Sequence, residues 1–188
     1  MNDKRLLDTK PLSSLALSSG IQTWGQLIKY VQLLPYGRNS DRANFSMVLT
    51  EKKGSCSSKH ALLKLIAEEN NISDVKLILA IYRMNKSNTP GIGLELEKHG
   101  LDYIPEAHCF LKLRNLYKDF TTISSNYEKL KKDILIEKEI NPIHVVQDKI
   151  DFHKNFIKDW LGQKHSSLDF EQAWLVREKC IKNLSEEN

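Results

Sequence analysis

The fold of this chain is decided by one segment, Gly54-Ser55-Cys56-Ser57-Ser58-Lys59-His60-Ala61-Leu62-Leu63. Serines on both sides of Cys56 suit the N-terminal cap of a helix, and the apolar residues that follow recur at helical spacing. Asn70 and Asn71 offer a stop to this pattern. The segment therefore predicts a turn that contains a glycine, followed by a helix that begins at or beside Cys56.

Cys56 stands where the start of a helix changes the chemistry of a thiol. Unpaired backbone N–H groups and the helix macrodipole favour an anion at this end, so a thiol there ionises more readily than a free thiol, whose pKa is about 8.5. Cys56 is therefore a candidate nucleophile. The alternative interpretation is that Cys56 is a small buried hydrophobic residue without a chemical role.

The composition suits one domain that carries a helical appendage. The 188 residues are 40% hydrophobic and 28% charged, which is enough apolar material for a sizeable core. We expect a weakly patterned N-terminal lead-in over residues 1–22, a core over residues 23–140 and a C-terminal helical extension over residues 141–188, packed on the core.

Charge and cysteine content argue against several kinds of partner. The 28 Lys and Arg residues against 24 Asp and Glu give a mild, dispersed net charge of +4, which does not indicate nucleic acid. No stretch approaches the roughly 20 apolar residues that a membrane span needs, and the N-terminus lacks the apolar run of a signal peptide. Three cysteines, without the spacing of a disulfide framework, favour a reducing compartment. We expect a cytoplasmic protein that binds neither nucleic acid nor membrane.

Hydrophobic periodicity predicts an α+β fold. Helices are expected over residues 23–34, 42–51, 56–69, 94–98, 126–135, 144–161 and 169–184, and strands over residues 75–84, 107–114, 117–121 and 136–140, the last an edge strand. The long connection over residues 85–106 is of the kind that often forms a lid or insertion.

The second and third strands are expected to form a tight hairpin that turns at residues 115–116. Arg114 then opposes Tyr117, and Lys112 opposes Asp119. His108 lies diagonally from Asp119 in this register. Direct contact between the two side chains needs a bulge or strand twist.

The order of these residues resembles the transglutaminase-like superfamily of papain-like cysteine hydrolases. Gly54-Ser55-Cys56 opens an apolar helix, His108-Cys109-Phe110 lies on a strand and Tyr117-Lys118-Asp119-Phe120-Thr121 on the next, and the resemblance covers roughly residues 24–122. Cys109 replaces the family's usual Ala, and Phe110 and Tyr117 replace Trp.

The resemblance implies a helix that carries the cysteine, packed on a small antiparallel sheet, and a catalytic triad. Cys56 is then the nucleophile, His108 the general base and later acid, and Asp119 the group that orients His108. The implied activity is thiol-dependent acyl transfer on a protein or peptide amide, by hydrolysis or transamidation, with no cofactor. The different-class alternative is a catalytically idle domain of the same fold that binds a protein partner.

Three further assignments stay open from the sequence. Cys56, His60, His108 and Cys109 could form a zinc site, although strand alternation points His108 and Cys109 in opposite directions. His60 could replace His108 as the base, although a position four residues along the same helix places its ring beside the helix wall. The family's oxyanion hole uses the nucleophile's own N–H and an upstream side chain, and the candidates for this side chain are Gln22, Gln26, Asn39 and Asn44.

Overall fold

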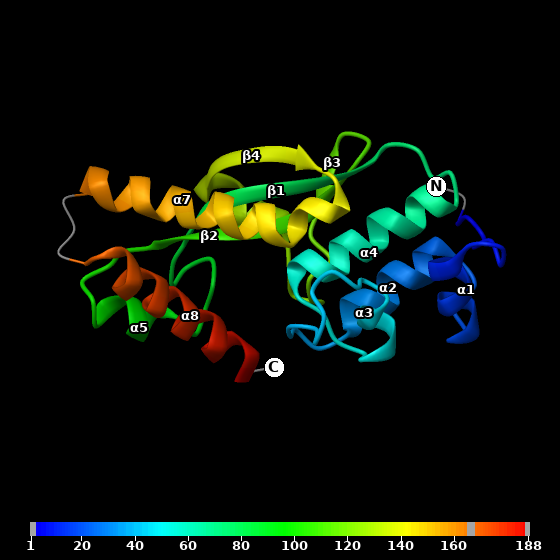
Figure 1. Ribbon diagram of the computed structural model, residues 1–188, viewed down its shortest axis with the longest axis horizontal. Helices are drawn as coiled ribbons and strands as arrows, with labels where there is room; N and C mark the ends of the chain where they lie inside the picture. Colours follow the sequence, from blue (N-terminus) through cyan, green and yellow to red (C-terminus); the bar gives the residue numbers. More distant parts are fainter. Residues whose placement is uncertain (1–2, 165–167, 187–188) are drawn as a thin grey trace. The chain divides into compact units, whose positions relative to one another are not determined.

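The computed structural model describes residues 3–164 and 168–186, and the predicted α+β fold class is confirmed. One antiparallel sheet has the strand order β3-β2-β1-β4, so β4 lies at an edge as expected (Figure 1). The strands are β1 (Val75–Met84), β2 (Ile104–Leu113), β3 (Leu116–Lys118) and β4 (Ile134–Ile140).

Contacts along the chain group it into two compact units. Unit 1 consists of Met1–Leu79, Cys109–Tyr127 and Lys138–Val146, and unit 2 of Ala80–His108, Glu128–Glu137 and Gln147–Asn188. Strands β1, β2 and β4 therefore contribute residues to both units. The division into residues 1–22, 23–140 and 141–188 stays a prediction.

Unit 1 is built around the helix predicted at Cys56. Helix α4 (Cys56–Glu69) is buried on nearly all sides, as expected of a helix at the centre of a core. It contacts α1 (Pro11–Ser18), α2 (Trp24–Leu33), α3 (Met47–Thr50) and the 3₁₀ helix η2 (Pro142–Val145) (Figure 1). The Trp24 indole N–H donates to the Leu63 carbonyl 3.4 Å away, which fixes α2 against α4.

Helix α1 lies within the lead-in, where no helix was predicted, and it is capped from outside. Its own N-cap position, Lys10, makes no side-chain cap. The Glu69 carboxylate instead accepts the backbone N–H groups of Leu12 at 3.1 Å and Ser13 at 2.8 Å, and the Ser13 hydroxyl at 2.6 Å. The last turn of α4 thus supplies the negative charge that a helix N-terminus favours.

Helix α3 is shorter than predicted, because side chains in the preceding segment bond to the backbone. The Asp41 carboxylate accepts the Ala43 N–H at 2.8 Å, and the Asn44 side-chain oxygen accepts the Ser46 N–H at 3.2 Å. Such local bonds compete with helical ones. Only Met47–Thr50 of the predicted residues 42–51 are α-helical.

The predicted register of the hairpin is wrong, and the turn starts one residue earlier than predicted. Lys112 pairs with Tyr117 and Leu113 with Leu116, because Arg114 adopts a left-handed φ of 54° and the turn falls at Arg114 and Asn115. The Arg114 N–H donates to the Asp74 carbonyl at 2.7 Å. Strand β3 ends at Lys118, so Asp119 follows the strand instead of opposing Lys112.

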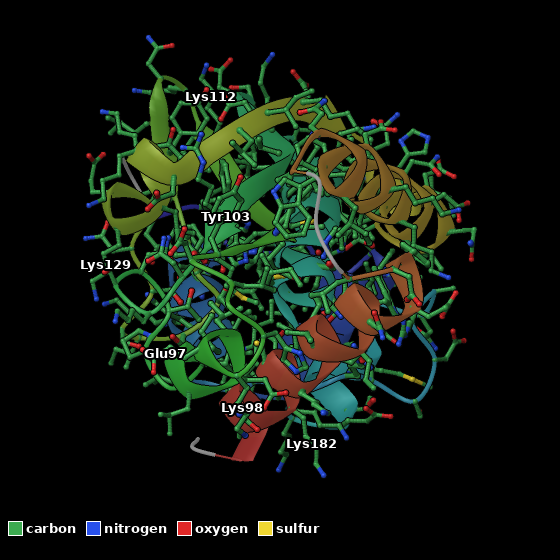
Figure 2. All side chains as sticks on the ribbon, turned by 90° about the vertical axis from the view of Figure 1, so that its left-hand side faces the viewer. Glu97, Lys98, Tyr103, Lys112, Lys129 and Lys182 are labelled. Atoms are coloured by element: carbon green, nitrogen blue, oxygen red, sulfur yellow. The ribbon has the colours of Figure 1, made fainter. Side chains whose placement is uncertain are left out.

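Unit 2 contains α5 (Gly93–Glu97), α7 (Gln147–Lys164) and α8 (Phe170–Glu186), and α8 contacts both of the others. Most of α6 (Tyr127–Leu130) and all of the 3₁₀ helix η1 (Lys131–Asp133) also belong to it. The predicted helix over residues 126–135 is thus replaced by these two short elements and the start of β4. Figure 2 labels Glu97 at the end of α5, Lys98 just after it and Lys182 on α8, the helix that α5 contacts.

A buried ion pair organises the interior of unit 2. The Arg177 guanidinium donates from Nε to Glu106 Oε2 and from Nη2 to Glu106 Oε1, both at 2.6 Å. The His153 ring contacts the Pro105 carbonyl through Nε2 at 2.8 Å, and burial lowers the pKa of His153. These bonds attach α7 and α8 to β2.

The connection over residues 85–106 holds α5 and part of a cavity of about 340 Å³. The Glu95 carboxylate on α5 is buried and lies 3.1 Å from the Lys98 ammonium and 3.4 Å from that of Lys179. These ion pairs anchor α5 within unit 2, and the role of the connection as a lid stays a prediction. In the described part of the chain, no helix has both the length and the apolar character needed to cross a membrane.

Replacing Glu69 with alanine should lower the free energy of unfolding by about 1–2 kcal/mol, because two backbone donors at the start of α1 lose their acceptor. Urea denaturation measures the change. Glu68→Ala is the matched control, since Glu68 is exposed and pairs with Lys64 one turn earlier on the same helix. Equal effects of the two substitutions would contradict the external cap.

The pH dependence of stability should report the Glu106–Arg177 pair. Burial acts to raise the pKa of the Glu106 carboxyl, but the charge and hydrogen bond of Arg177, together with the charges of His153 and Lys149, outweigh it and the pKa falls from 4.5 to about 2. A lowered pKa in the folded state stabilises the protein above the unfolded value, and this contribution disappears as the pH falls from 4.5 towards 2.

Urea unfolding between pH 6 and pH 3 should therefore show a steeper loss of stability in the native chain than in Glu106→Gln. The variant should also be less stable at pH 6, because Arg177 is left without its buried partner. Glu139→Gln, which changes an exposed pair with Lys76, should keep the native slope. The assignment fails if the native chain and Glu106→Gln have the same slope.

Candidate functional site

Cys56 is the first residue of α4, as predicted, and a reciprocal serine cap closes this end of the helix. The Ser58 N–H donates to the Ser55 hydroxyl at 3.3 Å, and the Ser55 N–H donates to the Ser58 hydroxyl at 3.0 Å. The cap fixes the start of the helix at Cys56. The Cys56 residue is 5% exposed. Its sulfur therefore lies at the positive end of a buried helix.

A lysine that sequence reasoning did not single out lies one turn further along α4. Lys59 has no exposed surface, and its ammonium donates to the carbonyl oxygens of Leu34 and Thr121, both at 2.6 Å. Burial lowers the pKa of Lys59 from 10.5 to about 8, against the opposing influence of the Cys56 and Asp119 charges. The site thus contains a buried cation close enough to act on both predicted anions.

Gly54 is needed because the Lys59 side chain passes directly over it. A Cβ at position 54 would lie 2.8 Å from Lys59 Cγ, which is closer than Cβ atoms in proteins approach other heavy atoms. The backbone of Gly54 also makes two hydrogen bonds. Its N–H donates to the Pro35 carbonyl at 3.1 Å, and its carbonyl accepts the Gly37 N–H at 3.2 Å. The glycine of the predicted turn therefore makes room for the lysine.

Asp119 lies in unit 1 and is held in one orientation. Its Oδ1 accepts the Thr121 N–H at 3.0 Å and the Thr121 hydroxyl at 2.6 Å. Both residues are buried. The Thr121 carbonyl in turn accepts a hydrogen bond from Lys59. Asp119, Thr121 and Lys59 thus form one continuous network.

His60 is unsuited to the role of base, because both of its ring nitrogens are used by the backbone. The Phe120 N–H donates to Nε2 at 2.8 Å, so the proton of the neutral ring is on Nδ1 and is donated to the Cys56 carbonyl, also at 2.8 Å. Asp119 Oδ1 lies 3.8 Å from Nε2, which exceeds hydrogen-bond distance. His60 instead ties the start of α4 to the Asp119 segment.

His108 lies on β2 in unit 2 and is half-buried. Its ring meets the Tyr82 ring edge to face, with the centroids 6.0 Å apart. Its chain neighbour Cys109 belongs to unit 1, where the Ser57 hydroxyl lies 3.7 Å from the Cys109 sulfur. Contact of the His108 ring with Cys56 and Asp119 stays a prediction.

The other assignments left open by the sequence lose support. Both N–H donors of the Asn39 amide are used, by Glu51 and by the Lys53 carbonyl, while Gln22, Gln26 and Asn44 are exposed. In the described residues, no three side chains of His, Cys, Asp or Glu have an arrangement that could hold a metal ion. The engaged ring of His60 leaves no nitrogen for zinc.

No protein-family model, curated protein or solved structure matches this chain.

Substituting alanine for Gly54 should lower the free energy of unfolding by about 1–3 kcal/mol, because the added methyl group overlaps Lys59 Cγ. Thermal or urea denaturation measures this loss. Gly37→Ala serves as the control, since a Cβ there would lie 3.4 Å from Lys53 Cδ, an ordinary contact. If Gly54→Ala is no less stable than Gly37→Ala, the Lys59 stem does not occupy the position described.

Proposed function

We propose that the protein is a cysteine-dependent enzyme of transglutaminase-like type that transfers the acyl group of a protein or peptide amide. Cys56 is the nucleophile, His108 the general base and then acid, and Asp119 the group that orients His108. The papain-like arrangement of the core is part of this proposal. Hydrolysis is the simpler outcome for a chain of this size, and transamidation would replace water with an amine.

One observation carries the proposal: the thiol of Cys56 stands at the N-terminus of a buried, capped helix, one turn before a fully buried ammonium. The helix end and the cation both favour a thiolate over a thiol. Asp119, which the family resemblance makes the third member of the triad, lies in the same hydrogen-bonded network as that ammonium. These features give a cysteine a nucleophile's surroundings.

In the proposed reaction, the Cys56 thiolate attacks the amide carbonyl carbon and forms a C–S bond. The C–N bond then breaks as the His108 imidazolium gives its proton to the leaving amine, which leaves a thioester on Cys56. In the second half, His108 takes a proton from water as the oxygen attacks the thioester. The acid product departs and the thiolate returns, so no cofactor or oxidant is needed.

Asp119 is suited to its proposed role because Thr121 restricts its carboxylate. With Oδ1 held by two donors, the group cannot rotate freely, and a fixed carboxylate can hold an imidazole in one tautomer and orientation. His60 does not compete, since its bonds to the Cys56 carbonyl and the Phe120 N–H keep it neutral.

Burial of Cys56 favours a second candidate function. At 5% exposure the residue offers little surface to a substrate, as expected of a catalytically idle domain that binds a protein partner. Reactivity of the thiol separates the two functions. A reducing compartment such as the cytoplasm suits either one, because Cys56, Cys109 and Cys180 are all free thiols.

Iodoacetamide at pH 6, followed by mass spectrometry of peptides, should alkylate Cys56 far faster than Cys109 or Cys180. An ordinary thiol is only about 0.3% ionised at this pH, so an ionised thiol reacts up to about 300-fold faster. Cys180 is a suitable internal control, because burial raises its pKa to about 11. His108→Ala and Asp119→Asn should each slow the alkylation of Cys56 at least about tenfold.

His144→Ala is the matched histidine control and should leave the rate of Cys56 alkylation unchanged, since the His144 ring accepts the Asn141 N–H at the start of η2 and has no role in the proposed triad. Similar, slow rates for all three cysteines would favour the binding domain. Rapid alkylation of Cys56 that is unchanged in His108→Ala would rule out His108 as its base.

A further inference from the structure

Lys59 is a charged side chain inside the core for which the proposed triad has no role. Its ammonium donates to the Leu34 carbonyl at the end of α2 and to the Thr121 carbonyl after β3, both at 2.6 Å. The side chain has no exposed surface. Both acceptors are neutral, so neither supplies the counter-charge that a buried ammonium requires.

The candidate counter-charges are the two anions of the proposed site. Cys56 lies three residues before Lys59, on the same side of α4. Asp119 is held by Thr121, the residue whose carbonyl binds the ammonium. Attraction between charges is mutual, so a cation that these anions stabilise must favour their ionised forms to the same extent.

We propose that Lys59 is a positioning residue for the reaction, whose buried ammonium keeps the Cys56 thiolate ionised and fixes the segment that carries Asp119. This inference rests on the proposed function, because it assigns the source of the nucleophile's charge. Two cations then favour the Cys56 thiolate: the fixed ammonium of Lys59 in α4 and the imidazolium of His108, which gives up its proton during the reaction. The thiolate persists when the imidazole has given up its proton.

The titratable groups around Lys59 agree with this assignment. Helix α4 offers the Cys56 thiol and the His60 ring, and the ring is neutral because Nε2 accepts a hydrogen bond. The segment after β3 offers Asp119, and the end of α2 contributes the neutral Leu34 carbonyl. Burial lowers the pKa of Lys59 to about 8, so the ammonium is charged at neutral pH and its influence declines above pH 8.

The test is the rate of Cys56 alkylation between pH 5 and pH 9 in Lys59→Met, which keeps the length of the side chain and removes its charge. We expect the midpoint of the rate profile to rise by about one pH unit or more, which slows alkylation by up to about tenfold at pH values below the native midpoint. Lys59→Arg should keep the native midpoint if it folds. A midpoint unchanged within about 0.2 units would overturn the inference.

A reciprocal measurement avoids any change to the buried lysine. In a chain labelled with ¹³C-lysine, the titration of Lys59 is followed by NMR in the native protein and in Cys56→Ala, with the signal assigned by its absence from Lys59→Arg or Lys59→Met. Loss of the thiolate should lower the Lys59 titration midpoint. An unchanged midpoint in Cys56→Ala would contradict the coupling even where Lys59→Met does not fold.

The outcomes separate this inference from the proposed function. If His108→Ala slows Cys56 and Lys59→Met leaves the pH midpoint in place, the triad stands and the role of Lys59 is wrong. If Lys59→Met shifts the midpoint and His108→Ala has no effect, the lysine activates the thiol and the proposed base is wrong.

Discussion

Burial of one ammonium is the constraint on which the surroundings of Cys56 depend. A charged group is stable inside a core only when its donors are satisfied and a counter-charge is near. The Lys59 ammonium meets the first condition by joining the end of α2 to the segment after β3, and its stem fills the space over Gly54. Two segments distant in sequence, the end of α2 and the segment after β3, must therefore keep fixed positions around the start of α4.

The two units satisfy their buried cations in different ways. In unit 2 the Arg177 guanidinium has a bidentate bond to Glu106, so its charge is neutralised where it lies. In unit 1 the Lys59 ammonium is held by two neutral carbonyls, so its field acts on the anions nearby. The first arrangement suits a structural link between a helix and a strand. The second suits a site where a nearby group must carry negative charge.

Strong local patterns made part of this structure predictable. Strand β1 and the start of α4 agree with the prediction because a β-branched run and a serine cap are local signals. The hairpin register was wrong because the left-handed Arg114 starts the turn one residue before the predicted turn at residues 115–116. Helix α1 was missed because its cap, Glu69, lies far along the chain.

Prediction of the candidate site was limited because its residues are held by contacts with segments distant in sequence. Cys56 could be recognised from its place before an apolar helix, whereas Lys59 resembles an ordinary solvated helix residue until the acceptors from α2 and the segment after β3 are known. Its only sequence signal is a lysine three residues after the cysteine, inside an apolar pattern. The two bonds that occupy His60 are likewise tertiary.

The central claim is that the Cys56 sulfur is a nucleophile served by the His108 ring. It is tested most directly by a crystal structure of the protein treated with a peptide aldehyde, which forms a hemithioacetal with an active-site thiol. The account predicts the adduct on Cys56, with a His108 ring nitrogen within about 3.5 Å of the sulfur or the new hydroxyl. An unmodified Cys56, or an adduct with the His108 ring turned away behind packed side chains, would contradict it.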